Sequence, residues 1–165
     1  MSKWRIWFWS VFVVICMVLI ALVSAIWNNL SSEWNVEEVA AQAALNQSPI
    51  DHILRHDVFT GADVQEVFVG TDAFGRTWDV FVYGSPFQVH AVPASTVLSP
   101  DAILKRTAVA ALHPTAVHLG YLDAGEQRKL NTSTHVVYEI EHRNSKGLIF
   151  YTYVDATSGK LLATY

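Results

Sequence analysis

Two histidines, His52 and His56, are separated by three residues and flanked by Asp51 and Asp57. On a helix this H-x-x-x-H spacing would place both imidazoles on one face, where they could bind zinc. The glutamate that follows the first histidine in the H-E-x-x-H motif of metalloproteases is missing here. Pro49 lies just upstream, so we expect a solvated polar connection rather than a metal site.

Other side chains capable of acid–base or acyl-transfer chemistry are not arranged for it. Glu139 and Glu141 could form a carboxylate pair, but they alternate with apolar residues and are expected on the solvated side of a half-buried strand. The sequence contains no G-x-S-x-G nucleophile motif and no phosphate-binding glycine run. We therefore expect a protein that is not an enzyme, with no catalytic residue, metal or cofactor. A weak metal-dependent hydrolase centred on His52 and His56 is the enzymatic alternative.

Four aromatic residues are the best candidates for a partner-binding surface: Phe81, Tyr83, Tyr151 and Tyr153. They lie in two similar segments, GRTWDVFVYG and GLIFYTYVDA, each with a glycine followed by large apolar residues at both odd and even positions. Both faces of each expected strand are therefore apolar. The aromatic residues either form a core between two halves of the domain or form an exposed patch that docks a partner.

The two segments indicate a duplicated unit of a helix followed by β-hairpins. Gly75, Gly147 and Gly159 are expected in turns, as is Asp155, whose carboxylate would accept N–H groups from the following backbone. Strands are expected over residues 64–69, 77–83, 88–92, 116–122, 134–141, 148–155 and 160–164.

Helices are expected at the start of each unit. One should begin at Ser31 or Ser32 and end at Leu45, and the other should begin at Ser99, with Pro100 in its first turn, and continue to Leu112. Residues 123–133 are expected to form a polar loop. The predicted class is α+β, with each helix packed on a three-stranded antiparallel sheet in subdomains spanning residues 28–95 and 96–165.

An apolar run over residues 6–27 exceeds the roughly 20 residues needed to cross a bilayer. Lys3 and Arg5 precede it, so the positive-inside rule predicts a cytoplasmic N-terminus at residues 1–5 and a domain outside the cell membrane. A cleaved signal peptide is the alternative. The single cysteine, Cys16, lies within the run, so the outer domain is expected to fold without disulfides.

The charge distribution argues against two classes of partner. All 15 acidic residues follow the apolar run, whereas Lys3 and Arg5 account for two of the 11 basic residues. The outer domain therefore carries net negative charge, which disfavours nucleic acid and anionic lipid.

The motifs together resemble a known family. The segments EVFVGTDAFGRTWDVFVYG, SPDAILKRTAVAAL and VVYEIEHRNSKGLIFYTYVDATSGKLLATY are similar to the TseB-like (YpmB-type) cell wall elongation regulators of Gram-positive bacteria. The most specific element is the Tyr-x-x-x-Asp-x-x-x-Gly-Lys ending, here Tyr151, Asp155, Gly159 and Lys160. The resemblance implies a single-pass membrane anchor followed by two PepSY-like (cystatin-like) subdomains. It also implies an extracytoplasmic contact with a penicillin-binding protein, of class B; inhibition or modulation of an envelope protease is the alternative.

Overall fold

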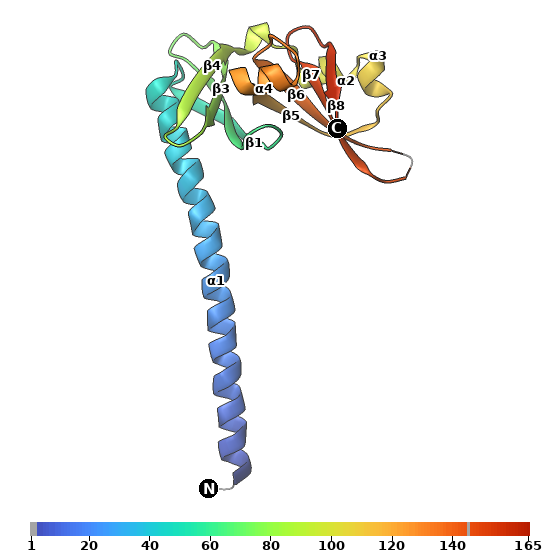
Figure 1. The fold of residues 1–165 in the computed structure, drawn as a ribbon. Coiled ribbons are helices and arrows are strands. Elements are labelled where there is room, and N and C mark those ends of the chain that lie inside the picture. Colours follow the sequence, from blue (N-terminus) through green and yellow to red (C-terminus); the bar gives the residue numbers. More distant parts are fainter. Residues whose placement is uncertain (1–2, 145) are drawn as a thin grey trace. The chain divides into compact units, whose positions relative to one another are not determined.

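The computed structural model describes residues 3–144 and 146–165, which form a long N-terminal helix and two antiparallel sheets (Figure 1). The chain divides into two compact units, one ending at Val39 and the other spanning Ala40–Tyr165. The first sheet has the order β1-β2-β3-β4 and the second the order β5-β6-β7-β8. The predicted α+β class is therefore confirmed.

The N-terminal helix, α1 (Lys3–Gln47), is continuous over 45 residues. The prediction that a separate helix begins at Ser31 or Ser32 was wrong. No glycine or proline interrupts the sequence between residues 3 and 47, so nothing forces the chain out of the helical conformation there. The helix ends two residues before Pro49, because a proline disfavours helical backbone in the residue that precedes it.

Part of α1 is long and apolar enough to cross a membrane. Residues Trp7–Ile26 have a mean hydropathy of 2.8, and none of this stretch is buried. Side chains such as Phe12 and Leu19 are at least half exposed, although apolar groups of this size are normally removed from water. This finding supports a single membrane anchor; a signal sequence near the N-terminus meets the same criteria of length and hydropathy.

The last turns of α1 pack against the first sheet, within the second unit. Ala40, Ala43 and Ala44 are buried in one apolar cluster with Phe68 and Val80. Small side chains at these helix positions allow the helix backbone to approach the sheet closely, which explains the alanine-rich sequence at this end.

The first sheet contains β1 (His52–Phe59), β2 (Gln65–Thr71), β3 (Thr77–Tyr83) and β4 (Gln88–Pro93). It has four strands rather than the predicted three, because β1, expected as a polar connection, pairs with β2 along its length. His52 and His56 are therefore four residues apart on a strand, about 13 Å, which is too far for them to share a zinc ion. Instead the His56 ring stacks on Phe68 and its Nε2 lies 2.5 Å from Glu66.

The second sheet contains β5 (Pro114–Tyr121), β6 (Val136–Arg143), β7 (Ile149–Asp155) and β8 (Leu161–Thr164). It also has four strands rather than three. A short 3-10 helix, η1 (Ala94–Thr96), follows the first sheet and precedes the helices of the second half. The predicted subdomain division at residues 95 and 96 lies within this connection.

The helix predicted from Ser99 to Leu112 is divided into α2 (Pro100–Leu104) and α3 (Thr107–Ala110). Its predicted start is confirmed, since the Ser99 hydroxyl accepts the Ala102 N–H and Pro100 occupies the first turn. Ile103 and Val109 are both fully buried. In one straight helix their side chains would point about 120° apart, so the break allows both to enter the core.

A third short helix, α4 (Ala124–Lys129), replaces the polar loop predicted over residues 123–133. The Asp123 carboxylate caps it by accepting the N–H groups of Gly125 at 2.7 Å and Glu126 at 2.8 Å. Asp123 followed three residues later by Glu126 is a recognisable N-terminal helix signature, and the sequence interpretation overlooked it.

Equivalent turns open the third strand of each sheet. In the first, the Asp72 carboxylate accepts the backbone N–H groups of Phe74 and Arg76. In the second, Asn144 Oδ1 accepts those of Lys146 and Leu148, at the same sequence intervals. Gly75 and Gly147 follow at matching positions with φ of 76° and 79°, which glycine adopts without strain. The repeated turn supports the duplication of a helix followed by an antiparallel meander.

The turn at Asp72 makes an acid-sensitive contribution to stability. Burial alone would raise the pKa of Asp72, but hydrogen bonds from Arg76, Trp78 and Phe74 lower it from 3.8 to about 2. The stability contribution is thus complete above pH 3.8 and is lost as the pH falls towards 2. Asp72→Asn should keep the two backbone contacts, as Asn144 does, and lose the bonds from the Arg76 and Trp78 side chains.

We expect Asp72→Asn to be less stable than wild type at pH 7 and to lose less stability between pH 4 and pH 2. Urea denaturation of the full chain in micelles across this pH range measures both effects. Asp51→Asn, which alters an exposed carboxylate, is the control. Equal acid sensitivity of Asp72→Asn and wild type would contradict the role of this carboxylate.

The two sheets share one apolar core. Phe59 and Phe81 from the first sheet are fully buried in the same cluster as Val137, Ile140 and Val154 from the second. At the edge of this core the buried Gln65 side chain forms two hydrogen bonds with the backbone of Tyr121, at 2.6 and 2.9 Å. The sheets are therefore joined within the second unit by packing and by hydrogen bonds.

Candidate functional site

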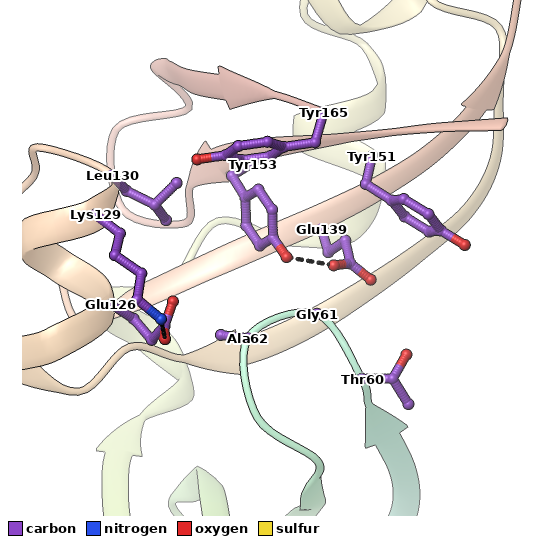
Figure 2. Close-up of a pocket in the computed structure, with 10 residues that line it drawn as sticks. All are labelled: Thr60, Gly61, Ala62, Glu126, Lys129, Leu130, Glu139, Tyr151, Tyr153 and Tyr165. Carbon is purple, nitrogen blue, oxygen red and sulfur yellow. Dashed lines mark hydrogen bonds and ion pairs between the residues drawn. The ribbon is translucent and has the colours of Figure 1, made fainter.

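A cavity of about 460 Å³ lies between the β1–β2 loop and the second sheet (Figure 2). The loop contributes one wall, α4 contributes another, and β6, β7 and the residue after β8 contribute the rest. The lining residues are Thr60, Gly61, Ala62, Glu126, Lys129, Leu130, Glu139, Tyr151, Tyr153 and Tyr165. Its volume lies within the range of small-molecule pockets, which makes it a candidate binding site.

The cavity contains a buried carboxylate, Glu139, which is only 3% exposed. Figure 2 shows the Tyr153 hydroxyl directed at it, and this hydroxyl donates a hydrogen bond of 2.6 Å to Glu139 Oε2. Burial, this hydrogen bond and the negative charge of Glu139 raise the pKa of Tyr153, so the phenol keeps its proton and acts as a donor. The expectation that Glu139 lies on a solvated strand face was wrong.

Gly61 closes the cavity from the side of the first sheet. A methyl group at this position would lie 2.0 Å from Glu139 Oε2 and 2.4 Å from the Tyr153 hydroxyl. Only glycine therefore allows the loop to pass so close to the Glu139–Tyr153 pair. The contact also links the loop of one sheet to the polar group of the other.

A lysine–glutamate pair forms the wall contributed by α4. Lys129 Nζ lies 2.5 Å from Glu126 Oε1, one turn earlier on the helix. The Asp123 cap that starts α4 therefore determines where both charged side chains are placed. Within the described residues, Lys129 makes no ion pair with Glu139.

Three of the four aromatic residues predicted as a docking surface are buried. Phe81 is 0%, Tyr83 8% and Tyr153 6% exposed, so the interpretation that they form an exposed patch was wrong for these three. Phe81 and Tyr83 lie at the junction of the sheets, where both rings are within 6.0 Å of the Tyr121 ring. Tyr151 is 39% exposed and is the member that can contact a partner directly.

The turn residues lie at strand ends. The Asp155 carboxylate accepts the backbone N–H groups of Thr157 at 2.8 Å and Ser158 at 3.2 Å. Burial raises the pKa of Asp155, but these bonds and that from the Thr157 hydroxyl outweigh it and hold the pKa below its ordinary value. Gly159 has φ of 72°, and a methyl group there would lie 2.9 Å from the Arg106 guanidinium. These residues are structural.

The Glu139–Tyr153 pair could have been predicted from the position of the turn between their strands. The turn at Asn144–Gly147 sets the register of β6 and β7, which pairs Glu139 with Tyr153 and Glu141 with Tyr151. A carboxylate and a phenol facing each other across a hairpin can form a hydrogen bond. The loop that covers them belongs to the other sheet, and no local pattern indicates that contact.

Comparison with known proteins identifies one informative structure. No family model matches the chain, and no curated protein matches it. The solved structure of the YpmB protein from Bacillus subtilis is similar, with a TM-score of 0.61 and 25% sequence identity. The fold is YpmB-like. The likeness covers 77% of this chain and 94% of the YpmB chain.

Proposed function

We propose that this protein is a non-enzymatic, membrane-anchored binding protein that regulates cell wall elongation by contacting a class B penicillin-binding protein outside the cytoplasm. The observation that carries the proposal is the YpmB-like fold, which extends over most of both chains. The wall-regulating role comes from the resemblance of the sequence motifs to the YpmB-type regulators. The apolar stretch Trp7–Ile26 supplies the anchor, and Lys3 and Arg5 favour a cytoplasmic N-terminus.

The internal duplication supports PepSY-like subdomains in this protein. Each half begins with helix and continues into a four-stranded antiparallel meander. The Asp72 and Asn144 turns occur at the same place in each meander.

The surface that we assign to the partner is the exposed apolar end of β7 and the turn before it. Leu148 is 59%, Ile149 43% and Tyr151 39% exposed. Ile149 and Tyr151 lie on the same face of the strand because they are two residues apart. Exposed aromatic and aliphatic groups of this kind are typical of the centre of a protein interface. Anchoring both proteins in one bilayer raises their effective concentration, so a modest contact area suffices.

In-cell crosslinking followed by affinity purification of the full-length protein tests this function. We expect wild type to capture a class B penicillin-binding protein, and Ile149→Ser and Tyr151→Ala each to reduce the yield several-fold. Phe74→Ser is the matched control, because Phe74 is an 84% exposed apolar residue in the equivalent turn region of the first sheet.

Two outcomes would overturn the proposal. One is the absence of any penicillin-binding protein from wild-type captures. The other is inhibition of envelope proteases by the purified protein without retention of a penicillin-binding protein, which would favour the inhibitor alternative. Equal losses with Phe74→Ser and Ile149→Ser would reject the assigned surface.

A further inference from the structure

We propose that the cavity beneath the β1–β2 loop binds a primary ammonium group on a flexible aliphatic chain, as in a lysine side chain, with Glu139 as its counter-ion. Tyr151, Tyr153 and Tyr165 form its aromatic walls. The site does not depend on the proposed protein partner, and its ligand is recognised by charge and aromatic contact.

Glu139 is a buried carboxylate that accepts a hydrogen bond from Tyr153. This side chain is 3% exposed, and its Oε2 accepts the hydrogen bond from Tyr153. No other hydrogen bond to Glu139 is made by the described residues, and its side chain lines the cavity. A buried carboxylate is costly unless a positive group or further donors satisfy it. An ammonium group has three donors and the required charge.

Three tyrosine rings line the cavity. The Tyr153 and Tyr165 rings are 6.0 Å apart at an angle of 78°, so they form two sides of a corner (Figure 2). Tyr151 lies on the same strand face as Tyr153, two residues away, and lines the same cavity. Aromatic faces attract cations that lie within about 6 Å of the ring centre.

Negative charge predominates around the cavity. The one lysine that lines the cavity, Lys129, is held by Glu126. The hydrogen bond and charge of Glu126, together with the charges of Asp63 and Asp123, raise the pKa of Lys129. The lining therefore holds two carboxylates, Glu126 and Glu139, and one lysine, and Asp63 and Asp123 add negative charge near that lysine. This balance favours a cation and disfavours an anion. The cavity of about 460 Å³ is large enough for the four methylene groups that carry a lysine ammonium.

Nuclear magnetic resonance of the full chain tests the site directly. The protein is placed in polyoxyethylene ether micelles, whose headgroup carries neither an amine nor a sugar. Nα-acetyl-lysine amide is the probe, and Nα-acetyl-norleucine amide, which lacks the charge, is its control. N-acetylglucosamine serves as a neutral sugar. We expect the lysine probe alone to cause saturable shifts of the Gly61, Ala62 and Tyr153 backbone amide signals.

Variants assign the binding to the cavity. Glu139→Gln keeps an acceptor for the Tyr153 hydroxyl and removes the charge, and it should weaken binding about tenfold. Asp101→Asn removes an exposed carboxylate that does not line the cavity and should leave binding unchanged. Tyr165→Leu removes one aromatic wall at a 63% exposed position and should weaken binding about threefold, so the test holds even if Glu139→Gln fails to fold.

Three results would overturn the proposal. The first is the absence of shifts with the lysine probe. The second is equal binding of the norleucine probe or the sugar, which would make the cavity an apolar or glycan site. The third is unchanged lysine binding in both Tyr165→Leu and a folded Glu139→Gln.

Discussion

Phe59→Ala is expected to destabilise the domain formed by the two sheets by about 3–5 kcal/mol, because it removes a large ring from the centre of the core. Phe59 is 0% exposed and belongs to the cluster that contains residues from both sheets. The ring also lies against Gly120 of β5 and near Gly61 of the cavity loop. Its loss therefore weakens the junction between the sheets as well as the first sheet itself. Domains are stable by about 5–15 kcal/mol, so the variant should lose a large part of the total.

Denaturation of the full chain in micelles, followed by near-ultraviolet circular dichroism, measures this change. The tyrosine signal reports the packing of the domain formed by the two sheets. Val58→Ala is the matched control, because Val58 is the neighbouring β1 residue and is 37% exposed. It should cost much less than Phe59→Ala. A loss of less than 1 kcal/mol for Phe59→Ala would show that the sheets do not depend on this ring.

The strands with alternating or continuous apolar residues could be predicted from the sequence, whereas β1 could not. The segment 77–83 was predicted with its observed bounds, since glycine and β-branched or aromatic residues mark it clearly. In contrast, β1 carries histidine, arginine and aspartate because it is an edge strand with only one pairing neighbour. Its polar sequence is typical of a connection, and its strand conformation depends on pairing with β2.

The candidate site was less predictable than the fold because it is built from segments distant in sequence. Tyr151 and Tyr153 were identified from their strand, but their roles differ: Tyr153 is buried against Glu139, and Tyr151 is partly exposed. The wall formed by the β1–β2 loop includes Gly61, which lies nearly 80 residues before Glu139 in the sequence. Local pattern predicts strands and turns, whereas the pairing of two sheets depends on tertiary packing that no local pattern contains.

Gly120→Ala is expected to destabilise the protein by about 1–3 kcal/mol, because the added methyl group has no space. An ideal Cβ at this position would lie 2.4, 2.5 and 2.6 Å from three atoms of the Phe59 ring. The ring is fully buried and cannot move without opening the core. Gly120 thus enables β5 to pass close to the first sheet, and its role is steric rather than conformational. The same denaturation experiment measures the effect.

The double variant Phe59→Ala/Gly120→Ala separates this steric explanation from a general loss of strand stability. If the methyl group clashes only with the ring, removing the ring also removes the clash. The double variant should then be about as stable as Phe59→Ala alone, which corresponds to a coupling of about 1–3 kcal/mol between the two sites. Additive losses would show that Gly120 is required for another reason. A strong coupling would show that the contact between Phe59 of β1 and Gly120 of β5 stabilises the packing of the two sheets. The same packing keeps the β1–β2 loop close to Glu139.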